Sequence, residues 1–164
     1  MYDKQTESLW SQIKGEAVTG PLTGTELEVL PSTLTTWKKW QKKYPDTQVL
    51  SFATGYKRDY SSDPYLDYYQ QQSGFRSFFK LGPNEKEKEL VVGIELDGQA
   101  KAYPLRKIKQ AGRLNDRFAG RKLTIFFDAT TDRLSLTDES GKPVEQMIVY
   151  WFVWKAIWPD TARY

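Results

Sequence analysis

Two segments of this chain carry the same pattern of aromatic residues and turn formers. Residues 37–47 read Trp-Lys-Lys-Trp-Gln-Lys-Lys-Tyr-Pro-Asp-Thr, and residues 151–161 read Trp-Phe-Val-Trp-Lys-Ala-Ile-Trp-Pro-Asp-Thr. The Trp, Pro, Asp and Thr positions match at a single offset of 114 residues, as the starts at 37 and 151 show. A pattern of this length that recurs at one offset predicts two related structural units.

A second match extends the prediction. Residues 2–9 agree in type with residues 127–134, at an offset of 125. We therefore expect one domain over 1–164, in which 1–53 form the back half of a first unit and 91–164 form a whole second unit. Residues 54–90 are a connection rich in Tyr and Asp. On this interpretation the front half of the first unit is missing from the chain.

The local signals predict a β-rich α+β fold, with short antiparallel strands and two repeated aromatic helices packed on the sheets. Residues 91–103 read as a hairpin on a two-residue Asp-Gly turn. One aromatic helix is expected to begin at Ser32 or Thr33 and to end before Pro45, followed by a short strand at 48–52. The other is expected over 148–158, ended by Pro159.

The aromatic set is expected to form the core, because at helical spacing the rings fall on one face and the lysines on the other. Lysines that alternate with rings could also bind nucleic acid. The amphipathic spacing favours a solvated basic face instead, and we expect no nucleic-acid partner. Exposed rings as a platform for sugars are the other alternative. The set comprises Trp10, Trp37, Trp40, Tyr103, Tyr150, Trp151, Trp154 and Trp158.

The chain has no Cys and no His, and these absences exclude several kinds of chemistry. Without Cys there is no disulfide or thiolate nucleophile, and without His there is no usual nitrogen ligand for zinc, copper or haem. No run approaches the roughly 20 apolar residues that span a bilayer. Residues 1–4 lack the build of a secretory signal. We expect a soluble protein with no membrane partner, and its compartment is not indicated.

Several segments together resemble an uncharacterised prokaryotic family, the domain of unknown function 3179, and in particular its second half. Members of that family are about twice this length, and their first unit carries Cys-Pro-Leu-Cys-Gly and a His before Asn-Asp. The corresponding segments here, 128–132 and 110–116, contain neither Cys nor His. The resemblance therefore implies no catalytic residue in this chain. The segments that carry it are 2–12, 30–37, 44–47, 55–60 and 101–105.

One segment is a candidate ligand site. Residues 58–67 read Arg-Asp-Tyr-Ser-Ser-Asp-Pro-Tyr-Leu-Asp, with three carboxylates at four-residue spacing. Such oxygens could bind calcium or line a pocket for a polar ligand. The alternative is a loop held by Asx turns, and no Gly stands where a helix-loop-helix calcium site needs one. The candidate ligand-binding residues are Arg58, Asp59, Tyr60, Asp63, Tyr65 and Asp67.

The sequence favours a non-catalytic structural or ligand-binding half of a duplicated domain. A carboxylate-based hydrolase or lyase acting on a sugar-like substrate stays open as the alternative, although no particular acid pair is indicated. Asp46 and Asp160 are interpreted as turn formers. We expect no metal and no cofactor. The expected partner is the missing first half-unit or a second copy of the chain.

Overall fold

The computed structural model describes residues 1–30, 32–70 and 87–164. Within these ranges it has ten strands in three sheets and four helices, which confirms the β-rich α+β class. The chain divides into two compact units, Met1–Ser32 and Thr33–Tyr164. These units are defined by contacts within the chain. The boundaries at 53 and 90 come from the sequence repeat instead, and they stay a prediction.

The first unit is a three-stranded antiparallel sheet in the order β1-β2-β3, formed by β1 (Tyr2–Asp3), β2 (Ser8–Ser11) and β3 (Glu16–Thr19). The turn between β1 and β2 pairs Tyr2 with Leu9 and Asp3 with Ser8. In this unit Ser8 and Ala17 are buried.

The larger unit is built around a four-stranded sheet in the order β10-β5-β4-β9. Its strands are β4 (Leu90–Leu96), β5 (Gln99–Pro104), β9 (Met147–Tyr150) and β10 (Ala162–Arg163). The predicted hairpin over 91–103 is confirmed. Asp97 and Gly98 form its two-residue turn, both with positive φ (52° and 74°), as this type of connection requires. β10 pairs with β5 in parallel.

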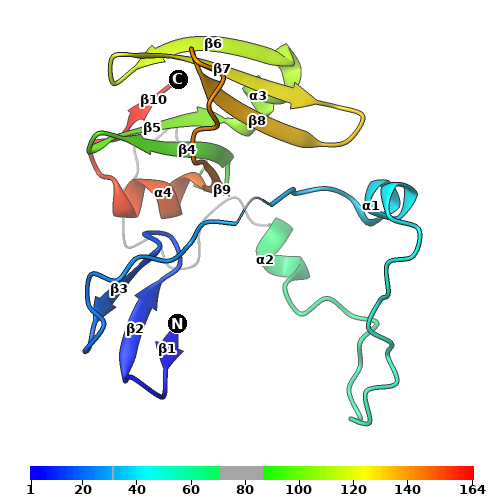
Figure 1. Ribbon diagram of the computed structural model, residues 1–164. Helices are drawn as coiled ribbons and strands as arrows, with labels where there is room; N and C mark the ends of the chain where they lie inside the picture. The colour runs from blue at the N-terminus through cyan, green and yellow to red at the C-terminus, as the bar shows by residue number, and fades with distance from the viewer. Residues whose placement is uncertain (31, 71–86) are drawn as a thin grey trace. The chain divides into compact units, whose positions relative to one another are not determined.

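A second sheet in the order β6-β7-β8 covers one face of the first (Figure 1). It consists of β6 (Arg113–Phe118), β7 (Arg121–Asp128) and β8 (Arg133–Asp138), and α3 (Leu105–Ala111) joins the two sheets and ends at Gly112. The main core lies between them. It contains Val92, Ile94 and Tyr103 from the first sheet, Leu105 and Ile108 from α3, and Leu123, Ile125, Phe127 and Leu136 from the second.

The opposite face of the β4–β5 hairpin is covered by α4 (Trp151–Ile157). Trp151 and Trp154 are each 1% exposed and pack with Val91 and Ala102. Gly93 makes this packing possible: a Cβ built on it would lie 2.2 Å from the Trp154 ring. The hairpin is therefore buried on both faces, by a sheet on one side and by two indoles on the other.

Two helices precede the hairpin, α1 (Trp37–Lys43) and α2 (Leu66–Gln70). The predicted start of the first aromatic helix was too early, because the Thr36 hydroxyl accepts a hydrogen bond from the Lys39 amide and caps the helix there. The strand expected at 48–52 does not form. The second aromatic helix is also shorter than predicted, since residues 147–150 pair with β4 as a strand.

The predicted burial of the aromatic residues holds for α4 and is wrong for α1. Trp37 is 49% exposed and Trp40 38%, and α1 buries none of its residues. The reason is that the described residues provide no sheet under the ring face of α1. In α4 the β4–β5 hairpin fills that role.

We predict that Gly93→Ala lowers the free energy of unfolding by about 3 kcal/mol, because the added methyl group would overlap the Trp154 ring. Urea unfolding followed by far-UV circular dichroism measures this loss. In a Trp154→Leu background the same substitution should cost much less. Glu95→Ala, at an exposed position of the same strand, is the control and should change stability by less than about 0.5 kcal/mol. Equal losses in both backgrounds would contradict the contact.

Candidate functional site

The two aromatic segments end in the same hydrogen bonds. The Trp40 indole Nε1 donates to the Thr47 hydroxyl at 3.0 Å, and the Trp154 Nε1 donates to the Thr161 hydroxyl at 2.8 Å. Each helix also closes with an amide bonded to the carbonyl of its second Trp, from Tyr44 and Trp158 respectively. The geometry is alike, and the difference is that one ring face is buried and the other is exposed.

Two turns are also alike. The Asp3 carboxylate accepts bonds from the Gln5 amide (2.9 Å) and the Thr6 hydroxyl (2.7 Å). The Asp128 carboxylate accepts bonds from the amide two residues on (2.8 Å) and the hydroxyl three residues on (2.7 Å). The hydroxyl bonds hold the pKa of both Asp side chains below the usual range. Positive φ values follow at the fourth residue on, Glu7 (54°) and Asp132 (57°).

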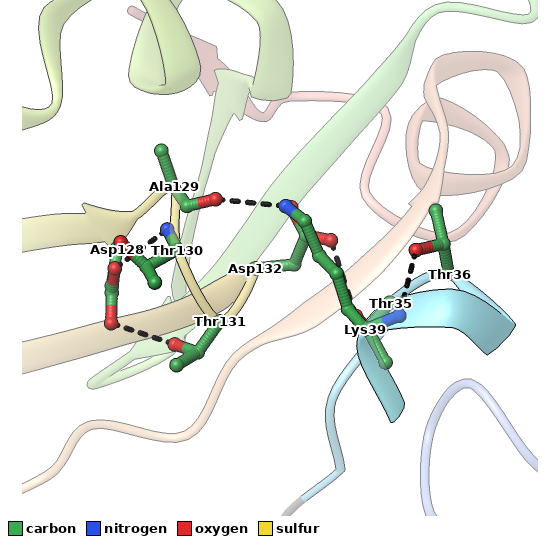
Figure 2. A network of polar contacts seen from close by, with 8 residues as sticks. All are labelled: Thr35, Thr36, Lys39, Asp128, Ala129, Thr130, Thr131 and Asp132. Atoms are coloured by element: carbon green, nitrogen blue, oxygen red, sulfur yellow. Dashed lines mark hydrogen bonds and ion pairs between the residues drawn. The ribbon is translucent and has the colours of Figure 1, made fainter. Parts of the chain in front are cut away.

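The turn after Asp128 is bonded to α1 (Figure 2). The Lys39 Nζ donates to the Asp132 carboxylate and to the Ala129 carbonyl, both at 2.8 Å, and the Thr35 hydroxyl donates to the same carboxylate at 3.1 Å. The hydrogen bond from Lys39 has the largest effect on the pKa of Asp132 and holds it below the usual range. These contacts attach the polar side of α1 to the β7–β8 turn and leave Trp37 and Trp40 exposed.

A second polar cluster joins the two sheets of the larger unit. The Asp116 Oδ2 accepts bonds from the Lys101 Nζ (2.5 Å) and the Tyr103 hydroxyl (2.8 Å), and its Oδ1 accepts one from the Arg117 amide (2.8 Å). Tyr103 is fully buried, and the Lys101 and Asp116 side chains are each 15% exposed. The Tyr164 ring lies 5.4 Å from that of Tyr103.

The cluster keeps Asp116 ionised. Burial alone would raise the pKa of this carboxyl group, but the hydrogen bonds from Lys101 and Tyr103 outweigh burial and leave the pKa lowered. Burial, together with the bond to Asp116, raises the pKa of Tyr103. Both oxygens of the Asp116 carboxylate accept hydrogen bonds, and Tyr103 keeps the proton that it donates. Because Asp116 lies in one sheet and its two side-chain donors in the other, these bonds join the two sheets.

The six predicted ligand-binding residues are all exposed, and few of them contact one another. Asp59 accepts from the amide and hydroxyl of Ser61 and from the Ser62 hydroxyl, which lower its pKa. Asp63 accepts from the Tyr65 amide at 2.8 Å, the one bond between two members of the set in the described residues. Tyr60 bonds Thr54 and stacks on Phe52. The Asx turns are present as the alternative interpretation expects, and a ligand role for the set stays a prediction.

The described residues contain no group of three or more acidic side chains placed to hold a metal ion. In the same part of the chain, no helix has the length and apolar character needed to cross a membrane. Lys38, Lys42 and Lys43 of α1 are exposed, whereas Lys39 is half-buried and pairs with Asp132.

Sequence reasoning missed both polar clusters. The signal for one was present: Leu114, Asp116 and Phe118 alternate on one side of β6, and an acid between two apolar residues on that side needs a buried partner. Lys101 and Tyr103 likewise share one side of β5. The Lys39–Asp132 pair joins residues 93 apart and has no local signal.

The fold and these sites define a β-rich α+β protein that carries two like aromatic helices, one covered by a hairpin and one exposed. The chain belongs to the family described as "Protein of unknown function (DUF3179)", whose model matches residues 1–161. Neither the comparison with curated proteins nor that with solved structures found a match.

We predict that Asp116→Asn lowers the free energy of unfolding at pH 7 by about 2 kcal/mol, because it leaves the Lys101 ammonium without its carboxylate. The folded pKa of Asp116 is below the unfolded value of 3.8, so its stabilisation is present above that pH and is lost as the pH falls through the folded value. The gap between wild type and variant should therefore narrow below about pH 4. Urea unfolding at a series of pH values measures it.

The matched control is Glu95→Gln, which removes an exposed carboxylate from β4 in the other sheet and should keep the wild-type pH dependence. A gap between wild type and Asp116→Asn that stays constant down to pH 2 would contradict the assigned role of the carboxylate.

We predict that Lys39→Met speeds amide hydrogen exchange in residues 37–43 about two- to fivefold, since a half-exposed ion pair contributes up to about 1 kcal/mol. Asp132→Asn should have the same effect, because it removes the other side of the pair. Lys38→Met alters a neighbouring lysine on the exposed side and should leave the exchange unchanged. If all three variants behave alike, the contact in Figure 2 does not hold α1 in place.

Proposed function

We propose that this chain is a non-catalytic structural and binding part of a duplicated fold, and that the ring face of α1 is its binding surface. The observation that carries the proposal is the contrast between two like helices. Trp151 and Trp154 of α4 are 1% exposed, whereas Trp37 and Trp40 of α1 are 49% and 38% exposed.

The duplication is supported by contacts that agree at two offsets. Tyr2 and Leu9 pair as Phe127 and Leu134 do, 125 residues later. The indole-to-threonine bonds and the helix ends agree at an offset of 114. Two unrelated segments would not be expected to share strand register, the C-terminal helix cap and the indole-to-threonine bond at once.

A binding role is supported by the apolar surface around α1 in the sequence. Large exposed apolar patches mark interaction surfaces on folded proteins. The rings of α1 lie in a stretch where many large apolar side chains are exposed: Leu34, Trp37, Trp40, Tyr44, Val49, Leu50 and Phe52. Leaving so many large apolar groups in water is unfavourable, so a partner that covers the helix would gain free energy from the burial.

The alternative, a hydrolase or lyase that uses carboxylates on a sugar-like substrate, has less support. A general acid of this kind needs a raised pKa. Every described carboxyl group with a shifted pKa has it lowered by hydrogen bonds or by a nearby cation, namely Asp3, Asp59, Asp116, Asp128, Asp132 and Asp138.

The test compares the two ring pairs in the free chain. We predict that the double variant Trp37→Ala/Trp40→Ala changes the free energy of unfolding by less than about 1 kcal/mol, because both rings are exposed. Trp151→Ala/Trp154→Ala should prevent folding, since each buried Trp contributes about 3–5 kcal/mol. Urea unfolding followed by circular dichroism measures both.

Equal losses from the two pairs would contradict the proposal, because α1 would then belong to the core of this chain. Hydrolysis of a glycoside by the wild-type chain, lost on substitution of a single Asp, would favour the alternative.

A further inference from the structure

The contact between α4 and the β4–β5 hairpin defines what a helix of this kind binds. The Trp154 ring lies directly on Gly93, where a Cβ would be 2.2 Å from the ring. Ala102 is the cross-strand neighbour of Gly93 and is fully buried, and Val91 completes the buried set. A flat site made by two small residues on paired strands is therefore the surface that accepts the second indole.

The segment that leads into the hairpin also binds the start of α4. The amides of Trp151 and Phe152 donate to the carbonyls of Glu89 and Glu87, at 2.8 and 3.0 Å. These amides belong to the first turn of the helix, where the helix itself offers no acceptor. The short segment 87–89 thus accepts the first amides of the helix, while the hairpin that follows it packs against the rings.

The face of α1 has the same features and nothing bound to them in the described chain. Trp40 and Tyr44 pack with ring centroids 4.5 Å apart, as Trp154 and Trp158 do at 3.8 Å. The amides of Trp37 and Lys38, which correspond to those of Trp151 and Phe152, donate to no such carbonyl among the described residues, and the Thr36 hydroxyl caps this end of α1 by accepting the Lys39 amide. The helix therefore presents two paired rings in the arrangement that the β4–β5 hairpin covers in α4.

The exposed lysines of α1 indicate the charge that a partner surface should carry at its edge. Besides Lys39, which pairs with Asp132, α1 carries Lys38, Lys42 and Lys43, and these three make no ion pair with a described carboxylate. A complementary surface would be acidic beside the small residues. The segment 87–89, Glu-Lys-Glu, carries two carboxylates in front of β4, and that of Glu89 pairs with Arg163 of β10.

We propose that α1 binds an antiparallel β-hairpin of another polypeptide, which places a Gly under the Trp40 ring, a small residue opposite that Gly, and a short acidic segment ahead of both. This inference rests on the proposed binding role of α1. The occupant is not the hairpin of a second copy of this chain, since Gly93 is already covered by Trp154 in every copy.

The test uses the full chain and a synthetic hairpin with the sequence of residues 87–104, closed by a disulfide that replaces the opposed pair Ile94 and Lys101. Those two positions point away from the face that receives the rings, because side chains alternate along a strand. The chain is labelled with 5-fluorotryptophan, and single Trp→Phe variants assign its six fluorine resonances. Saturable shifts of the Trp37 and Trp40 resonances are the expected result.

Two matched controls make the result specific. The same hairpin with Gly93→Val should bind at least tenfold more weakly, because the added side chain takes the place of the ring. The chain variant Trp40→Ala should lose the shift at Trp37. Lys4→Ala, on the exposed turn of the first unit, should bind the hairpin as the wild type does.

Three results would overturn the proposal. The Trp37 and Trp40 resonances stay unshifted at millimolar hairpin, the Gly93→Val hairpin binds equally well, or the resonances shift with the concentration of the chain alone, which would assign the face to a second copy. Each of these leaves the binding role of α1 standing if Trp37→Ala/Trp40→Ala still folds. Loss of folding in that variant would overturn the binding role itself.

Discussion

The close contact between the Trp154 indole and Gly93 is the interaction on which the packing of the larger unit depends. Because Gly93 has no side chain, Trp154 can approach the β4–β5 hairpin closely enough for α4 to bury the face that the β6-β7-β8 sheet does not reach. Both faces of one hairpin are then removed from water. The aliphatic and tyrosine side chains between the sheets and the tryptophans under α4 belong to separate cores that share the same two strands.

Polar groups fix the parts that apolar packing alone does not orient. Asp116 receives Lys101 and Tyr103 and sets how the two sheets of the larger unit meet. Asp132 receives Lys39 and holds α1 by its polar side. A carboxylate that accepts bonds from several donors permits only a narrow range of geometries, so these bonds fix the orientation of the elements that they join. Burial of apolar surface supplies most of the free energy.

Much of the larger unit could be predicted from sequence because its signals are local. The Asp97-Gly98 turn between apolar strands and the Gly112 that ends α3 each depend on a few adjacent residues. The exposure of Trp37 and Trp40 could not be predicted, since the spacing of an amphipathic helix gives its apolar side and not the surface that meets it. The Lys39–Asp132 pair joins residues 93 apart and has no local signal, whereas the alternation of Leu114, Asp116 and Phe118 in β6 does indicate a buried partner for Asp116. The carboxylate spacing around Asp59 indicates oxygens that could bind a ligand, and it is equally compatible with the Asx turns that the structure shows.

The bond between Trp40 and Thr47 has a consequence for any association at this helix. The Trp40 indole N–H already donates to the Thr47 hydroxyl. A partner that covers the ring therefore does not bury a polar group that has lost its hydrogen bond to water. An apolar partner therefore gains the full benefit of the ring, and binding should show the negative heat-capacity change of hydrophobic burial. With its N–H bonded to Thr47, the exposed face of Trp40 offers a partner an apolar surface only.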